Sequence, residues 1–196
     1  MVFLVLEGFS GTGKTSLAKG LEKTGWLRLQ ESAHAVPEEV PVADRADTFA
    51  DYSLLGATMM YSSMISKMRN TKDIVSEGYL LSDLAYARIR YDLGKSAAYP
   101  SMLKMVREIM GSPLMRPDLY VILEAGFETI EARQLGKSER ERNMTDFFRT
   151  RYYTALAEAH RELGEGNVNK VQTDSNLEST LGVIVDLLKK RKVTPG

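Results

Sequence analysis

The chain has 196 residues, of which 43% are hydrophobic and 27% are charged, a composition typical of one globular α/β domain. Lysine plus arginine and aspartate plus glutamate both number 26, so the formal net charge is +0. This balance indicates neither nucleic acid nor an anionic membrane as a partner. Cysteine is absent, which excludes disulfides and thiolate metal sites. We therefore expect one domain over residues 1–196, located in the cytoplasm.

A glycine-rich motif stands close to the start of the chain. Residues 8–15 read Gly-Phe-Ser-Gly-Thr-Gly-Lys-Thr and match G-x-x-x-x-G-K-[ST], the phosphate-binding loop. The apolar residues 2–6 before it are typical of a buried strand, and residues 16–23 after it have helical spacing. In this order of elements, backbone N–H groups and the start of the helix face phosphate oxygens. The residues expected to bind nucleotide are Gly8, Ser10, Gly11, Thr12, Gly13, Lys14, Thr15 and Ser16.

Two cofactors follow from this motif, ATP and Mg²⁺. We expect Lys14 to reach the β- and γ-phosphates of ATP and the Thr15 hydroxyl to ligate Mg²⁺. Enzymes with this loop often hold the metal with a second acid at the end of a strand. Residues 73–77 read as a short strand that ends in Glu77, so Glu77 is the candidate for that acid.

A second carboxylate follows another predicted strand. Residues 26–31 alternate roughly as a strand and end in Glu31, which a polar stretch follows. Open α/β sheets build their sites from loops at the carboxyl ends of strands, so Glu31 is a candidate catalytic group. A solvated glutamate at a strand end is the alternative. We expect His34, in the same loop, to be a surface residue.

Two predicted helices carry further expectations. Residues 45–68 have a broad apolar face rich in methionine, which indicates adaptable core, an acceptor pocket or a homodimer interface. A later helix begins near Ser82 or Asp83, and either residue is a candidate to cap it.

A charged segment at about residues 134–144 is the candidate for a mobile lid. Its Arg140 and Arg142 are candidate catalytic residues, because arginine suits phosphate and lid closure excludes water from ATP. A solvated helix surface is the alternative for this segment.

Alternation of strands and helices predicts an α/β fold of the P-loop NTPase class. We expect a five-stranded, mostly parallel sheet with helices on both faces, and a lid that contains arginine. The chain also resembles the thymidylate kinase family over most of its length. The segments that resemble the family's loop, D-R-Y-x-x-S-x-x-A-Y, P-D-L and lid motifs are residues 6–15, 77–86, 117–119 and 139–152.

This sequence departs from the family where the family binds the acceptor's phosphate. Gly78 stands in place of the arginine of the family's D-R pair. In another family motif, A-D-R, the corresponding residues here are Ala57-Thr58-Met59, so that arginine is missing too. The arginines that can replace them are Arg45, Arg88 and Arg90. The deoxynucleoside kinases are the rival resemblance, since their neutral 5′-hydroxyl acceptor needs a carboxylate base, a role for which Glu31 is placed.

The resemblance implies an ATP- and Mg²⁺-dependent kinase whose partner is a small nucleotide or nucleoside acceptor. We expect a deoxynucleoside monophosphate, dTMP, as that acceptor. The alternatives are a deoxynucleoside kinase that acts on a 5′-hydroxyl and a P-loop ATPase or regulatory module without a phosphoryl acceptor.

Overall fold

The strand before the glycine-rich motif, β1 (Phe3–Glu7), is the central strand of the sheet, and all its residues are buried. In the computed structural model, which describes residues 1–42, 45–135 and 146–192, five strands pair in parallel in the order β2-β3-β1-β4-β5. The four others are β2 (Leu27–Leu29), β3 (Ile74–Glu77), β4 (Leu119–Glu124) and β5 (Val168–Gln172). The predicted five-stranded parallel sheet is confirmed.

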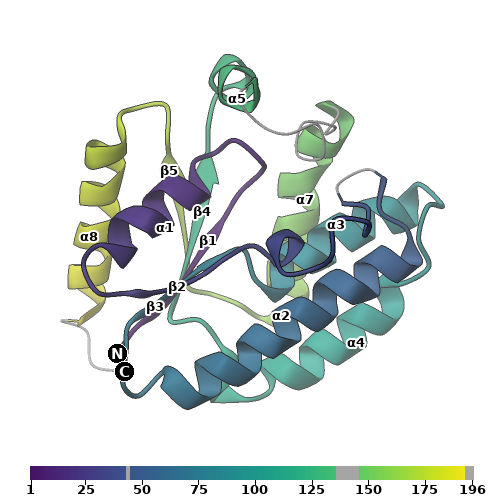
Figure 1. The fold of residues 1–196 in the computed structure, drawn as a ribbon, viewed down its shortest axis with the longest axis horizontal. Helices are drawn as coiled ribbons and strands as arrows, with labels where there is room; N and C mark the ends of the chain where they lie inside the picture. Colours follow the sequence, from purple (N-terminus) through teal and green to yellow (C-terminus); the bar gives the residue numbers. More distant parts are fainter. Residues whose placement is uncertain (43–44, 136–145, 193–196) are drawn as a thin grey trace.

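Helices cover both faces of this sheet (Figure 1). One face carries α1 (Lys14–Glu22) and α8 (Leu177–Lys192), which pack on Leu4 and Leu6 of β1. The opposite face packs on Phe3 and Val5, because successive side chains of a strand point to opposite faces. Its helices are α2 (Thr48–Met68), α3 (Leu80–Asp92), α4 (Tyr99–Met110) and α7 (Asp146–Leu163).

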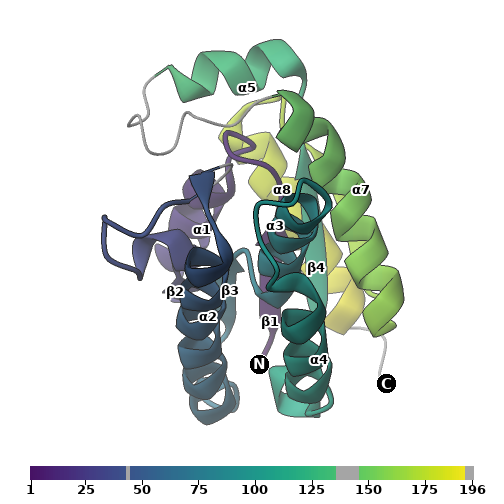
Figure 2. The ribbon, with the colours of Figure 1, turned by 90° about the vertical axis from the view of Figure 1, so that its right-hand side faces the viewer.

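The remaining helices are short. The helix α5 (Phe127–Gln134) extends beyond the carboxyl edge of the sheet (Figure 2). Two single turns, η1 (Ser32–His34) and η3 (Pro113–Met115), follow β2 and α4. No helix in the described part of the chain is both long and apolar enough to span a bilayer.

The methionine-rich face of α2 differs from our expectation of a core. Its side chains Met59, Met60 and Met64 are exposed by 37%, 71% and 42%, whereas Leu55 and Ile65 of the same helix are buried. The helix α2 contacts α3 and the turns η1 and η3, and the three methionine side chains lie on the part of its surface that faces solvent. Three methionines of this helix are therefore surface residues.

The predicted cap of α3 is also wrong. The helix begins with Tyr79 as its N-cap, so Ser82 and Asp83 lie inside the first turn. Both side chains are buried and bond to distant residues rather than to the helix start. Tertiary contacts, and not capping, explain these two polar residues.

Candidate active site

The glycine-rich motif forms a tight loop between β1 and α1. The ammonium group of Lys14 is buried and donates to the carbonyl oxygens of Gly8, at 2.6 Å, and Phe9, at 3.4 Å. Gly8 has φ 147°, and a Cβ there would stand 2.7 Å from the carbonyl oxygen of Leu123. Only glycine fits this position without displacing the backbone of β4. The loop therefore holds the geometry that the motif predicted.

A cavity of about 380 Å³ opens above this loop. Six of the predicted nucleotide-binding residues line it, and Ser10 lines a second cavity, whereas Gly8 lines neither. The six are Gly11, Thr12, Gly13, Lys14, Thr15 and Ser16. The far wall consists of residues from α5, from the segment after β5 and from α8, namely Arg133, Thr173, Ser175, Leu177 and Thr180.

Arg133 is a lining residue that the sequence analysis missed. Its guanidinium group donates to the carbonyl oxygens of Gly11, at 3.3 Å, and Thr173, at 2.6 Å. Its side chain is nonetheless exposed toward the cavity. The one signal in the sequence was a basic residue in the last turn of the helix after β4. Arg133 therefore adds a positive charge to the wall of the phosphate-loop cavity.

The two predicted metal ligands meet at the end of β3. The hydroxyl group of Thr15 donates to a carboxylate oxygen of Glu77, and the other carboxylate oxygen accepts from Arg28 Nε at 2.5 Å. Glu77 is buried, whereas Thr15 is exposed to the cavity. A hydroxyl and a carboxylate beside a phosphate loop are the oxygen ligands that Mg²⁺ uses together with substrate phosphates. The residues present fit that ion.

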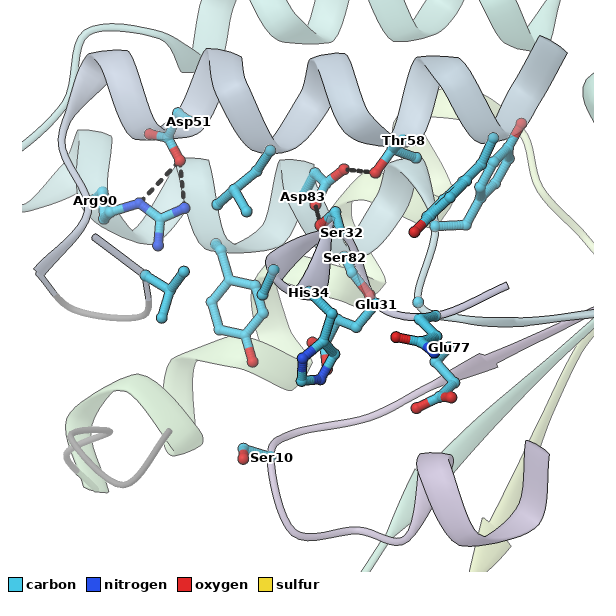
Figure 3. Close-up of a pocket in the computed structure, with 18 of the residues that line it drawn as sticks. Ser10, Glu31, Ser32, His34, Asp51, Thr58, Glu77, Ser82, Asp83 and Arg90 are labelled. Atoms are coloured by element: carbon cyan, nitrogen blue, oxygen red, sulfur yellow. Dashed lines mark hydrogen bonds and ion pairs between the residues drawn. The ribbon is translucent and has the colours of Figure 1, made fainter. Parts of the chain in front are cut away.

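A second cavity, of about 280 Å³, opens on the other side of Glu31 (Figure 3). It lies between α2, α3, the turn η1 and the strand end at Glu77. Glu31 lines both cavities, and its Oε1 atom lies 4.0 Å from Nζ of Lys14. His34, which we expected at the surface, is exposed but also lines this second cavity.

Polar side chains from α2 and α3 meet along the wall of this cavity. Asp83 accepts from Thr58 Oγ1 at 2.6 Å and from Ser32 Oγ at 3.1 Å (Figure 3). Burial raises the pKa of the Asp83 carboxyl to about 7, and these two hydrogen bonds oppose the shift. Farther along the two helices, Arg90 forms a fully buried ion pair with Asp51.

Solved structures with the same architecture include those of nucleoside and nucleotide kinases. A deoxyadenosine kinase from M. mycoides with bound dATP matches with a TM-score of 0.72 and 15% identity, over 96% of this chain and 100% of the other. A thymidylate kinase from Candida albicans matches with a TM-score of 0.74 and 15% identity, over 97% and 92% of the chains. The chain has the fold of these kinases. No protein-family model matches the chain, and no curated protein matches it in sequence.

The resemblance to thymidylate kinases that the motifs indicated is therefore confirmed as a likeness of fold. At 15% identity the chemistry of the site has to be argued from this chain's own residues. Glu77-Gly78 lies at the end of β3 as the motif comparison placed it, and the carboxylate bonds to Arg28 of the neighbouring strand. Arg28 was not singled out from the sequence, because its contact depends on the pairing of β2 with β3.

The three arginines proposed as replacements for the missing family arginines occupy different places. Arg90 lines the second cavity, where it pairs with Asp51. Arg88 instead pairs with Asp92, one turn away on the same helix, and Arg45 is exposed and does not line the cavity. The predicted lid arginines Arg140 and Arg142 lie outside the described residues.

A buried carboxyl group beneath the site was not predicted. Glu7, at the end of β1, accepts from Ser82 of α3 and, at 3.4 Å, from the hydroxyl of Tyr152 of α7. Burial raises the pKa of this carboxyl to about 8, against the opposing effects of Ser82 and of the charge of Lys14. Glu7 is therefore protonated at neutral pH and links the central strand to two helices.

Proposed function

We propose that the protein is an ATP- and Mg²⁺-dependent kinase that phosphorylates the 5′-hydroxyl of a deoxynucleoside. The observation that carries this proposal is the position of Glu31. Its carboxylate stands between the phosphate-loop cavity and the second cavity and lies 4.0 Å from the ammonium group of Lys14. A carboxylate at that boundary is placed to take a proton from a hydroxyl that attacks the γ-phosphate.

The charge of the second cavity favours a neutral acceptor. Among the described residues that line it, the only cation is Arg90, which is 1% exposed and paired with Asp51. The carboxylates that line it are Glu31, Glu38, Asp51, Glu77 and Asp83. A monophosphate would bring negative charge close to Glu31 and Glu77, where like charges repel. A nucleoside hydroxyl brings none.

In the proposed reaction, the 5′-oxygen attacks the γ-phosphorus atom in line with the bond to the β-phosphate oxygen. The hydroxyl proton passes to Glu31, the new oxygen–phosphorus bond forms, and ADP leaves with the electrons of the broken bond. Lys14 offsets the negative charge on the β- and γ-phosphates, and Arg133 adds positive charge beside them. Thr15 and Glu77 would hold Mg²⁺, which would supply further neutralisation of the phosphates.

Thymidylate kinase activity, with dTMP as the acceptor, is the second candidate. The match to the Candida albicans thymidylate kinase over 97% of this chain favours it, as does the order of the sequence motifs. The phosphate of dTMP is already an anionic nucleophile, so this reaction needs no base at Glu31. dTMP as the acceptor stays a prediction.

Measurement of ADP release with a panel of deoxynucleosides and their monophosphates tests these alternatives. We expect ADP release to be stimulated by at least one deoxynucleoside and the labelled γ-phosphate to appear on its 5′-oxygen. Stimulation by dTMP alone would replace the first candidate with the second. ATP hydrolysis that no acceptor alters would favour a P-loop ATPase or regulatory module and would contradict both.

A further inference from the structure

Asp51 of α2 and Arg90 of α3 line one end of the second cavity (Figure 3). Both side chains are 1% exposed. Arg90 Nε lies 3.0 Å from Oδ1 of Asp51, and a second guanidinium nitrogen contacts the same oxygen atom. The ion pair therefore uses one of the two carboxylate oxygens of Asp51.

The other carboxylate oxygen, Oδ2 of Asp51, is buried and accepts no hydrogen bond from the described residues. Asp83, which lines the same cavity, differs in this respect, because each of its carboxylate oxygens accepts a hydrogen bond. The donors are the hydroxyl groups of Ser32 and Thr58. A buried carboxylate oxygen without a donor is costly, so natural proteins rarely leave one. Since Asp51 lines the cavity, a ligand with an N–H group can supply the missing donor.

The place of Asp51 along the cavity indicates which part of a ligand reaches it. Asp51 and Thr58 lie seven residues apart on α2, and Asp83 and Arg90 lie seven residues apart on α3. At 1.5 Å per residue, the Asp51–Arg90 pair is roughly 10 Å from the Thr58–Asp83 pair. Figure 3 shows Asp51 and Arg90 at one end of the cavity, Glu77 at the opposite end, and Asp83 and Glu31 between them. A nucleoside with its 5′-hydroxyl at Glu31 therefore directs its base toward Asp51.

The group of a base that lies far from the sugar is position 6 of a purine or position 4 of a pyrimidine. Adenine and cytosine carry an amino donor there, whereas guanine and thymine carry a carbonyl acceptor. We infer that Asp51 selects acceptors whose base is adenine or cytosine over those with guanine or thymine. This inference rests on the proposed kinase function. An amino group donates to Oδ2, whereas a carbonyl oxygen would face it and leave both acceptors unpaired.

The substitution Asp51→Asn tests the inference, since an asparagine keeps a carbonyl oxygen for Arg90 and places an N–H₂ group where Oδ2 stands. We expect kcat/KM for deoxyadenosine and deoxycytidine to fall roughly 10- to 100-fold. The ratio of thymidine to deoxycytidine turnover should rise by at least the same factor. Asp92→Asn is the matched control, because Asp92 pairs with Arg88 outside the cavity and should leave the ratio unchanged.

A second measurement uses the unaltered protein and so does not depend on the folding of a variant. Purine 2′-deoxyriboside lacks only the amino group of deoxyadenosine, and we expect its kcat/KM to be roughly 10- to 100-fold lower. Equal values for these two substrates, or a wild-type preference for thymidine or deoxyguanosine, would overturn the inference while leaving the kinase function intact. Failure of every nucleoside and monophosphate to accept a phosphate would instead overturn the kinase function.

Discussion

The Nζ atom of Lys14 and the Oε1 atom of Glu31 lie 4.0 Å apart, although one residue belongs to the phosphate loop and the other follows β2. The cavity above the loop and the cavity between α2 and α3 share Glu31 as a lining residue. A buried cation and a carboxylate thus stand side by side at the boundary of two cavities. This relationship yields predictions for each partner separately.

The first prediction concerns Lys14. Replacing it with alanine should reduce phosphoryl transfer by at least roughly 10²-fold, because its charge would no longer offset the charge that develops on the phosphates. The fold should survive, which circular dichroism and a denaturation curve can check. Lys19→Ala is the control, since this lysine lies on the exposed side of the same helix. Transfer at a near-normal rate in the Lys14 variant would contradict the role of the loop.

The second prediction concerns Glu31. If the acceptor is a nucleoside, Glu31→Gln should lower kcat roughly 10²- to 10⁴-fold, the usual contribution of a general base. The exposed Glu39 nearby lines neither described cavity, so Glu39→Gln should have no such effect. Parallel assays with deoxyadenosine, deoxycytidine, thymidine and dTMP decide between the two candidate functions. Suppose that the Glu31→Gln and Glu39→Gln variants both phosphorylate dTMP at a normal rate and phosphorylate no nucleoside. The enzyme would then be a kinase of nucleoside monophosphates.

The third prediction concerns the metal. Glu77→Gln should raise the Mg²⁺ concentration needed for half-maximal activity and lower kcat, because a neutral amide is a weaker ligand than a carboxylate. A titration of activity against Mg²⁺ measures both effects. Glu124→Gln at the end of β4 is the control, since Glu124 pairs with Lys170 instead. An unchanged titration curve would mean that Glu77 does not bind the metal and only forms the structural ion pair with Arg28.

The fourth prediction concerns the stability of the fold against pH. The pKa of Glu7 rises from 4.5 to about 8 on folding, so above pH 4.5 the unfolded chain loses a proton that the folded chain keeps. The free energy of unfolding should therefore fall between about pH 4.5 and pH 8, by up to roughly 5 kcal/mol from this group. Asp83, whose pKa rises to about 7, acts in the same direction.

Glu7→Gln isolates the contribution of Glu7, because glutamine has no proton to lose. Relative to the wild type, the variant should gain stability steadily as the pH rises from 5 to 8, as measured by urea midpoints at three pH values. Glu39→Gln should show no such gain. Parallel stability curves for the wild type and the Glu7 variant would mean that Glu7 is ionised in the folded protein.

The sequence by itself determined the parts of this protein that depend on neighbouring residues. The phosphate loop is eight consecutive residues whose conformation follows from its glycines and from the strand and helix that flank it. The five strands follow from short apolar runs separated by helical patterns, and their parallel pairing follows from that alternation. Glu31 and Glu77 could be singled out because carboxyl ends of parallel strands meet at one edge of a sheet.

Only the tertiary structure decided which distant side chains meet. Asp51 and Arg90 are 39 positions apart, and their contact depends on how α2 packs against α3. The same holds for Arg133 and Gly11, which are 122 positions apart. It also holds for Ser82, which looked like a helix cap in the sequence but donates to the buried Glu7. Spacing along one helix predicts a face but not the partner of that face. The wall of the second cavity is therefore a property of the packed helices.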